Sequence, residues 1–325
     1  MNTLYPDIEP YTHYYLSMSA KKGTVVHQLY VEECGNPQGL PVIFLHGGPG
    51  SGCRASHRCF FNPKLYRIIL FDQRGCGRSR PYWDLESNTT AYLVDDIEQI
   101  RVTLAIDSWV VFGGSWGSTL GLVYAQHYPE RVMMMILRGI FLARQHDIDW
   151  VYSSSGAARI FPEAWELLMS VLTPLEQRTP LKSLYHHLVG DNEFRRAQVQ
   201  QAFNQWEQQI VTLRELNYQI SELVDVEPCN DAAAMLQLHY CLNLCFIAHQ
   251  PILANIDSIR EIPTHIVHGR YDMVCPVEQA WELAEVWPEA SLTILPLAGH
   301  AAGELTMVDT LVGLTDKVAA ELCSH

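Results

Sequence analysis

One seven-residue segment constrains the fold of this chain more than any other: Phe112-Gly113-Gly114-Ser115-Trp116-Gly117-Ser118. It places the pattern G-x-S-x-G between the apolar run Ser108–Phe112 and a helical run expected at Thr119–His127. The two flanking glycines leave room for a tight turn that exposes the serine between them. The pattern occurs once in 325 residues, and its context predicts a strand, a strained turn carrying Ser115 and a helix. That arrangement is a nucleophile elbow.

Short apolar runs alternate with helical patterns along much of the chain. The runs are Pro41–Leu45, Tyr66–Phe71, Ser108–Phe112, Val132–Leu137, Pro263–Gly269 and Ser291–Leu295. Apolar strands separated by helices indicate an α/β fold with a buried, mostly parallel sheet and helices on both faces. Residues 13–34 alternate apolar and polar side chains, which predicts an antiparallel pair of edge strands half exposed to water.

The pattern changes after Gly139. From about residue 140 to 258 long helical stretches dominate and strand candidates are few. We therefore expect a sheet domain formed by residues 1–139 and 259–325, interrupted by a helical cap of residues 140–258. Another helix is expected to begin after an N-cap at Asn88, Thr89 or Thr90. Two more are expected at Val277–Val286 and at about 303–322.

The charge balance excludes several classes of partner. Lys and Arg number 22 against 36 Asp and Glu, a formal net charge of −14, which argues against a general nucleic-acid or anionic-membrane surface. The start of the chain does not resemble a signal peptide, and no run of eighteen apolar residues occurs, so we expect a cytoplasmic protein. Nine scattered cysteines without metal-site spacing are interpreted as reduced thiols, and no metal or cofactor motif is found.

A serine hydroxyl needs a neutral imidazole to accept its proton and a carboxylate to orient that imidazole. In folds with a nucleophile elbow, the chain order is serine, acid, histidine. Asp272 follows the strand candidate Pro263–Gly269, and His300 follows Ser291–Leu295. Asp272 could instead cap the helix near Pro276, and His300 could be a surface residue. We nevertheless assign Ser115 as nucleophile, His300 as general base and Asp272 as its orienting acid.

Backbone N–H groups that stabilise a developing oxyanion can supply roughly 3 to 4 kcal/mol. One donor is expected to be the N–H of Trp116, directly after the nucleophile. The other is expected in the glycine loop His46–Gly50, at Gly47 or Gly48, which follows the strand Val42–Leu45.

Seven segments together resemble those of the proline iminopeptidases, or prolyl aminopeptidases, of the α/β-hydrolase superfamily. They are His46–Gly50, Asp72–Ser79, Gly113–Ser118, Leu137–Phe141, Trp206–Glu207, Gly269–Asp272 with Cys275–Pro276, and Ala298–His300. The resemblance covers nearly the whole chain. It implies an α/β-hydrolase fold with a helical cap, and an enzyme that removes N-terminal proline from peptides.

The resemblance also implies a binding pocket on the cap. Glu207 matches one of the family's acids that hold the substrate amine, although a helix glutamate is by default solvated. Phe141 matches its ring-packing residue, with a core phenylalanine as the alternative, and Cys275 matches a cysteine near the pocket, where a small apolar wall residue is the default. Gln237 stands where the family usually has a second glutamate, so we expect weaker binding of the amine.

We therefore expect a cytoplasmic serine aminopeptidase that acts on short peptides with a free N-terminal proline and needs no metal or cofactor. An esterase, lactonase or amidase with the same residues is the first alternative, because the fold alone does not choose the substrate. A binding protein on the same scaffold, without turnover, is the second. The sequence leaves the oligomeric state open.

Overall fold

A computed structural model of the chain describes residues 1–18, 26–213 and 231–323. Within these residues the centre is one eight-stranded sheet in the order β1-β2-β4-β3-β5-β6-β7-β8. The strands are β1 (Thr12–Ser17), β2 (Gln28–Gly35), β3 (Leu40–Leu45), β4 (Tyr66–Phe71), β5 (Trp109–Gly114), β6 (Val132–Arg138), β7 (Thr264–Gly269) and β8 (Ser291–Leu295).

The sheet is parallel from β4 to β8, whereas β2 is antiparallel to both β1 and β4. The expected antiparallel pair and mostly parallel sheet are therefore confirmed, and residues 19–25 of the segment 13–34 lie outside the described residues. The expectation that both strands of the pair are half exposed is wrong for β2, which is buried along most of its length. β2 is an inner strand, paired with β1 on one edge and β4 on the other, and Arg58 and Arg67 pair with its buried Glu32 and Glu33.

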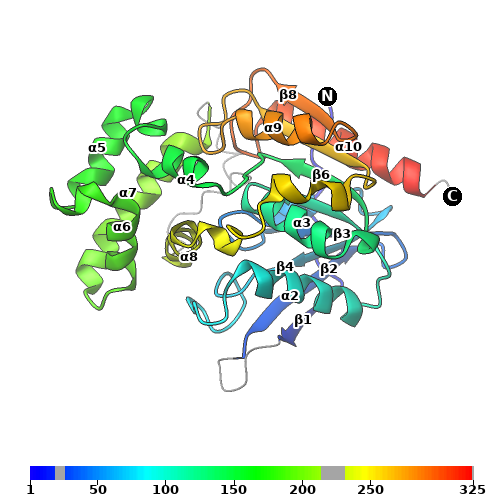
Figure 1. Cartoon of the computed structure of the whole chain (residues 1–325). Coiled ribbons are helices and arrows are strands. Elements are labelled where there is room, and N and C mark those ends of the chain that lie inside the picture. The colour runs from blue at the N-terminus through cyan, green and yellow to red at the C-terminus, as the bar shows by residue number, and fades with distance from the viewer. Residues whose placement is uncertain (19–25, 214–230, 324–325) are drawn as a thin grey trace.

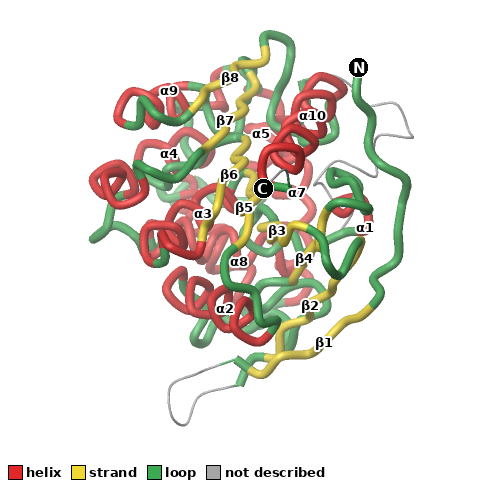
Figure 2. Tube along the Cα trace, turned by 90° about the vertical axis from the view of Figure 1, so that its right-hand side faces the viewer, coloured by secondary structure: helices red, strands yellow, loops and turns green. Residues whose placement is uncertain are grey.

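Alternate residues of the central strands enter separate cores on the two faces of the sheet. In β3, for example, Ile43 and Leu45 face one core, and Val42 and Phe44 face the other. The first face is covered by α2 (Thr90–Thr103), α3 (Trp116–His127), α9 (Glu278–Val286) and the 3-10 segment η6 (Ile252–Ile259); the second by α1 (Ala55–Arg58) and α10 (Leu305–Leu322). Figure 2 shows these two layers of helices with the sheet between them, which confirms the predicted architecture.

The helix expected after Asn88, Thr89 or Thr90 is α2, which begins at Thr90. Leu93, Ile97 and Ile100 of α2 are buried against the sheet. Thr89 occupies the N-cap position, but its side chain makes no capping hydrogen bond. Asn88 instead donates to the carbonyls of Arg74 and Asp84.

The described residues between β6 and β7 are helical or irregular. The helices are α4 (Gln145–Tyr152), α5 (Pro162–Ser170), α6 (Pro180–Val189), α7 (Glu193–Val211) and α8 (Asp231–Leu242), with short 3-10 turns η2 (Ala157–Arg159), η3 (Glu176–Arg178) and η5 (Leu244–Phe246). α4 to α7 lie beside the sheet and its layers, as Figure 1 shows in green.

These helices share an apolar core of their own, which includes Leu168, Leu184, Phe203 and Trp206. η6, by contrast, packs into the core of the sheet. The division of the chain at residues 139 and 258 stays a prediction.

The eight cysteines within the described residues are free thiols, and Cys229 lies outside them. No helix of the described part of the chain is long and apolar enough to cross a membrane.

Candidate active site

Ser115 sits in the turn between β5 and α3, with φ of 57° and ψ of −125°. A non-glycine residue in this region is strained, and such strain concentrates at functional sites. Both flanking glycines are required sterically: a Cβ at Gly113 would overlap the carbonyl of Gly117, and one at Gly117 would overlap the carbonyl of Leu45. The close packing of β5, α3 and β3 therefore explains the G-x-S-x-G spacing.

α3 begins at Trp116, three residues before the start expected at Thr119. The reason is that the carbonyl of Ser115 already accepts a hydrogen bond from the N–H of Ser118, at 2.8 Å. Because Trp116 is the first helical residue, its N–H has no partner within the helix. The positive end of the helix dipole also lies beside Ser115.

The glycine loop after β3 lies against the elbow. A Cβ at Gly47 would be 3.6 Å from the Cβ of Ser115, and Gly47, Gly48 and Ser115 line the same cavity. The expected oxyanion donors are thus close to the expected nucleophile. Their role in stabilising an oxyanion stays a prediction.

Gln73, which follows β4, connects this loop to α3. Its side-chain amide donates to the carbonyl of His46 at 3.1 Å and accepts from the indole N–H of Trp116 at 2.9 Å. Its backbone N–H donates to Nε2 of His46 at 3.0 Å. One buried side chain therefore holds both expected sources of oxyanion donors, a role that the sequence analysis missed.

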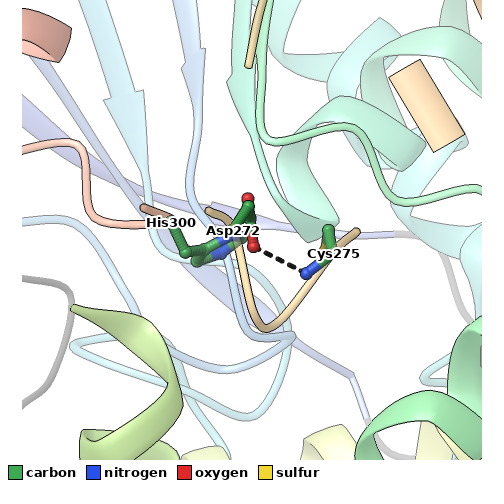
Figure 3. Close-up of side chains that lie close together, drawn as sticks. All are labelled: Asp272, Cys275 and His300. Carbon is green, nitrogen blue, oxygen red and sulfur yellow. Dashed lines mark hydrogen bonds and ion pairs between the residues drawn. The ribbon is translucent and has the colours of Figure 1, made fainter. Parts of the chain in front are cut away.

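His300 and Asp272 meet at the carboxyl ends of β7 and β8. Nδ1 of His300 lies 2.7 Å from Oδ2 of Asp272, and Oδ1 of Asp272 accepts the N–H groups of Val274 and Cys275 at 3.0 and 2.7 Å. Figure 3 shows the carboxylate between the imidazole and the Cys275 backbone. Burial opposes ionisation of Asp272, but the charge and hydrogen bond of His300 outweigh it, so the pKa of Asp272 is below its ordinary value.

This geometry determines the tautomer of His300. An ionised Asp272 accepts a hydrogen bond from the Nδ1–H group, so the ring keeps its proton on Nδ1 and Nε2 keeps a lone pair that can accept a proton. His300 and Ser115 line the same cavity. The structure thus brings together the three residues that the sequence analysis assigned to the nucleophile, base and acid.

Possible ligand atoms of Asp272, Cys275 and His300 lie within 4.8 Å of one another, so a metal site must be considered. Both oxygens of Asp272 already accept hydrogen bonds. Burial, and next the charge of Asp272, raise the pKa of the Cys275 thiol well above its usual value, which disfavours the thiolate that a metal would need. The donor set fits an acid–base pair better than a metal centre.

The loop that carries His300 is held by residues that the sequence analysis did not single out. Arg138 donates from Nη1 to the His300 carbonyl at 2.9 Å. Glu304 accepts the N–H of Gly299 at 2.7 Å. Buried charged residues next to sheet ends require partners, and that requirement is the signal that could have indicated Arg138.

The residues expected to bind substrate also line the cavity that contains Ser115. Phe141, Glu207, Gln237 and Cys275 all contribute to its wall. Tyr152 and Phe203, whose rings stack with centroids 6.2 Å apart, extend its apolar side. The four residues come from four separate segments of the chain, and the fold brings them together around one space.

Glu207, on α7, is the unusual group of this cavity. Its Oε1 is buried and has no hydrogen-bond partner among the described residues. Burial raises the pKa of Glu207, while the side chains of Gln237 and Tyr152 and the charge of His300 oppose that shift. Gln237 in turn donates from Nε2 to the Tyr152 hydroxyl at 2.8 Å. Tyr152 is a member of this group that the sequence analysis missed.

Comparison with known proteins agrees with these features. A family model described as the alpha/beta hydrolase fold matches residues 41–305. A proline iminopeptidase from Xylella fastidiosa is 44% identical over 320 residues, covering 97% of this chain and 99% of the relative. The chain belongs to the proline iminopeptidase family. The resemblance stated from the sequence is thereby confirmed, and membership identifies the chain as a hydrolase.

Other proline iminopeptidases match over similar lengths. The protein from Arabidopsis thaliana is 44% identical, covering 98% of this chain and 82% of the relative. The protein from Neisseria gonorrhoeae is 42% identical, covering 98% of this chain and all of the relative. Family membership therefore extends to the helices between β6 and β7, which the matches span.

Solved structures share the fold at lower sequence identity. A probable hydrolytic enzyme from Pseudomonas aeruginosa PAO1 superposes with a TM-score of 0.65 at 15% identity, covering 98% of this chain and 95% of that one. An esterase from Exiguobacterium antarcticum gives 0.60 at 17% identity, covering 94% and 99%. These likenesses establish the α/β-hydrolase fold alone.

Proposed function

We propose that the chain is a serine aminopeptidase that releases N-terminal proline from short peptides through an acyl-enzyme intermediate. The observation that carries the proposal is the buried carboxylate of Glu207 in the same cavity as Ser115. A buried carboxylate with one oxygen left unpaired is costly to ionise. A substrate ammonium group would neutralise it, and family membership supports the same substrate class.

The proposed chemistry uses Ser115, His300 and Asp272 in the roles expected from the sequence. Oγ of Ser115 attacks the carbonyl carbon of the first residue while Nε2 of His300 takes the hydroxyl proton. The negative charge on the former carbonyl oxygen is stabilised by the N–H groups of Trp116 and of Gly47 or Gly48. His300 then gives its proton to the leaving amine, and the C–N bond breaks.

Water completes the reaction by the same route. His300 accepts a proton from the water that attacks the acyl carbon, and it returns that proton to Ser115 as free proline leaves. Asp272 stays ionised and stabilises the imidazolium in both steps. None of these steps uses a metal or a cofactor.

Selection of the substrate is assigned to the helical segment. The prolyl ammonium has two N–H donors, one for Glu207 and one for the Gln237 carbonyl oxygen, while Phe141 and Cys275 form the apolar wall for the ring. We assign residues 140–258 as a cap that limits access to peptides with a free amine. The cytoplasmic location expected from the sequence is part of the same proposal.

Steady-state hydrolysis of a prolyl arylamide tests the proposal, measured beside its N-acylated form and a simple acyl ester with the unmodified chain and Ser115→Ala. We expect turnover of the free prolyl amide, little turnover of the N-acylated form, and loss of about 10⁶-fold in kcat in the variant. Activity confined to the ester or the N-acylated amide would instead indicate an esterase or amidase of broader specificity.

A further inference from the structure

A second histidine lies fully buried beside the expected catalytic acid. His268 is the penultimate residue of β7, and its Nε2 is 3.5 Å from Oδ2 of Asp272. The same Nε2 is 2.8 Å from the carbonyl oxygen of Cys275. On the other side of the ring, Nδ1 is 3.1 Å from the backbone N of Ile140. The proton transfers proposed for Ser115 and His300 do not use this residue.

The two backbone contacts determine the protonation of His268. Nδ1 accepts a hydrogen bond from the N–H of Ile140 and therefore carries no proton. The ring proton is then on Nε2, which donates a hydrogen bond to the Cys275 carbonyl. At 3.5 Å, the contact with Asp272 is too long for a strong hydrogen bond. The ring is thus neutral, and burial, which lowers the pKa of His268, favours the same form although the charge of Asp272 opposes it.

The segment on the Nδ1 side adjoins both the triad and the substrate wall. A Cβ at Gly139 would lie 3.2 Å from Cε1 of His300 and 3.5 Å from Oδ2 of Asp272. Two residues later, Phe141 contributes to the wall of the cavity. The position of Ile140 between them is held by the hydrogen bond to His268.

The segment on the Nε2 side is the acid loop, residues 272–275. Asp272 is held there by the N–H groups of Val274 and Cys275. The Cys275 carbonyl, bonded to His268, anchors the end of this loop to β7. A shift of that carbonyl would move the peptide that holds the Asp272 carboxylate.

We propose that His268 is a positioning residue that holds the acid loop and the segment 139–141 at a fixed separation through one neutral imidazole. Its Nε2–H orients the Asp272–His300 pair through Cys275, and its Nδ1 places Phe141 through Ile140. The inference rests on the proposed function for the identity of the substrate. The two roles belong to different ring atoms and are therefore separable.

Two substitutions separate them. In His268→Asn the side-chain oxygen can replace Nδ1 as acceptor for Ile140, but the donor to Cys275 is lost. In His268→Gln the amide N–H can replace Nε2 as donor, but the acceptor for Ile140 is lost. Each variant removes one of the two hydrogen bonds and keeps the other, so each serves as the control of the other for that bond, although asparagine is one methylene smaller than glutamine.

We expect the two variants to change different kinetic constants with a prolyl arylamide. His268→Asn should lower kcat by about 10-fold with KM nearly unchanged, the effect of one lost buried hydrogen bond on the acid loop. His268→Gln should raise KM by about 10-fold with kcat nearly unchanged, and should reduce the preference for prolyl over alanyl arylamide. The rates are expressed per active site, counted by titration. If the two variants and the unmodified chain then have the same kcat and the same KM, the inference is overturned and His268 has a structural role only.

The rate of labelling of Ser115 by an organophosphorus reagent makes the test independent of the substrate. His268→Asn should slow labelling about 10-fold, and His268→Gln should leave it nearly unchanged. An unmodified chain that is labelled but does not hydrolyse prolyl arylamide would refute the proposed function alone, since the labelling rates still judge His268. Equal labelling rates in the three proteins would refute the orienting role.

A measurement on the unmodified chain covers the case in which neither variant folds. Nitrogen-15 NMR of histidine-labelled protein should show one ring that is neutral, protonated at Nε2, and unchanged across the neutral pH range. An imidazolium or an Nδ1–H tautomer at that site would overturn the inference.

Discussion

The backbone N–H of His300 donates to the carbonyl oxygen of Val211 at 3.2 Å. Val211 is the last residue of α7, so its carbonyl is one of those that a helix end leaves without an internal partner. Glu207 lies about one turn earlier on the same helix. The loop of the expected general base and the helix of the buried acid are therefore joined through backbone, and a change in the Glu207 side chain need not displace His300.

Glu207→Gln should consequently affect binding of the amine more than the chemical step. The carboxamide keeps the shape but loses the charge that pairs with a prolyl ammonium. We expect KM for a prolyl arylamide to rise by about 10- to 100-fold, with kcat within a few-fold, as for loss of a hydrogen bond to a charged group.

Steady-state kinetics check this expectation, with Glu166→Gln as the control. Glu166 is an exposed glutamate of α5, so its loss should leave both constants unchanged. A fall in kcat with an unaltered KM would contradict an amine-binding role for Glu207.

Gln237→Glu should strengthen amine binding, and the structure adds a condition to that expectation. Residue 237 lies beside Tyr152 and Glu207, so a second carboxylate there would interact unfavourably with the first until substrate binds. We expect KM for a prolyl arylamide to fall by about 10-fold at neutral pH, and by less on acidification, because one proton is then shared by the acid pair.

Measurement of KM over a pH series checks the direction. Gln237→Met, of similar length but without hydrogen-bonding groups, is the control and should raise KM. If Gln237→Glu leaves KM unchanged at every pH, residue 237 does not contact the amine.

Much of the fold could be predicted because its signals are local. The glycines around Ser115 reflect backbone contacts within a few residues or with one neighbouring strand, and the apolar runs of the parallel strands have no polar face to confuse the pattern. The order of Ser115, Asp272 and His300 could be predicted for the same reason, since each residue follows a strand or precedes a helix of recognisable pattern.

The supporting residues could not be predicted in this way. Gln73 and His268 act by joining segments that are far apart in the chain. The hydrogen-bond partners of His268, and one partner of the Gln73 side chain, are backbone atoms, which carry no sequence signal. β2 was misjudged for a related reason: the partners of its buried glutamates, Arg58 and Arg67, lie on other segments. A polar residue within an apolar strand, such as His268, indicates only that some buried partner exists.

Asp272→Asn tests the orientation of His300. The carboxamide can present an N–H to Nδ1 and favour the wrong tautomer, with the proton on Nε2. By analogy with the same change in other serine triads, kcat should fall about 10⁴-fold. Kinetics with a prolyl arylamide measure the loss, and circular dichroism of the variant shows whether the fold is kept. A fall of only a few-fold would mean that Asp272 does not orient the base.

Gln73→Met should impair the chemical step without affecting amine binding. The variant loses the donor to the His46 carbonyl and the acceptor for the Trp116 indole, so the glycine loop and the start of α3 are no longer joined. We expect kcat to fall about 10-fold, less than the loss of an entire oxyanion donor, and KM to change little.

The check is a comparison of kcat and KM with Gln73→Glu, which keeps the acceptor for Trp116 and loses the donor to His46. An unchanged kcat in Gln73→Met would contradict a role for this side chain in holding the oxyanion donors.

The raised pKa of Glu207 also predicts a cost in stability that depends on pH. Below the ordinary range of glutamate the side chain is neutral in both the folded and the unfolded chain, so it carries no penalty. As pH rises, the unfolded chain ionises first while the buried side chain resists, so the free energy of unfolding decreases until Glu207 ionises in the folded state. Glu207→Gln cannot ionise, so its free energy of unfolding should exceed that of the unmodified chain by about 1 kcal/mol or more at neutral pH, and by little at low pH.

Asp272, whose pKa is lowered, has the opposite pH dependence. Its contribution cancels in the comparison, because the unmodified chain and Glu207→Gln both contain Asp272. Denaturant unfolding at neutral and acidic pH measures the difference between the two proteins. A variant that is less stable than the unmodified chain at neutral pH would mean that the buried carboxylate is satisfied without substrate, and the argument for an amine ligand would fail with it.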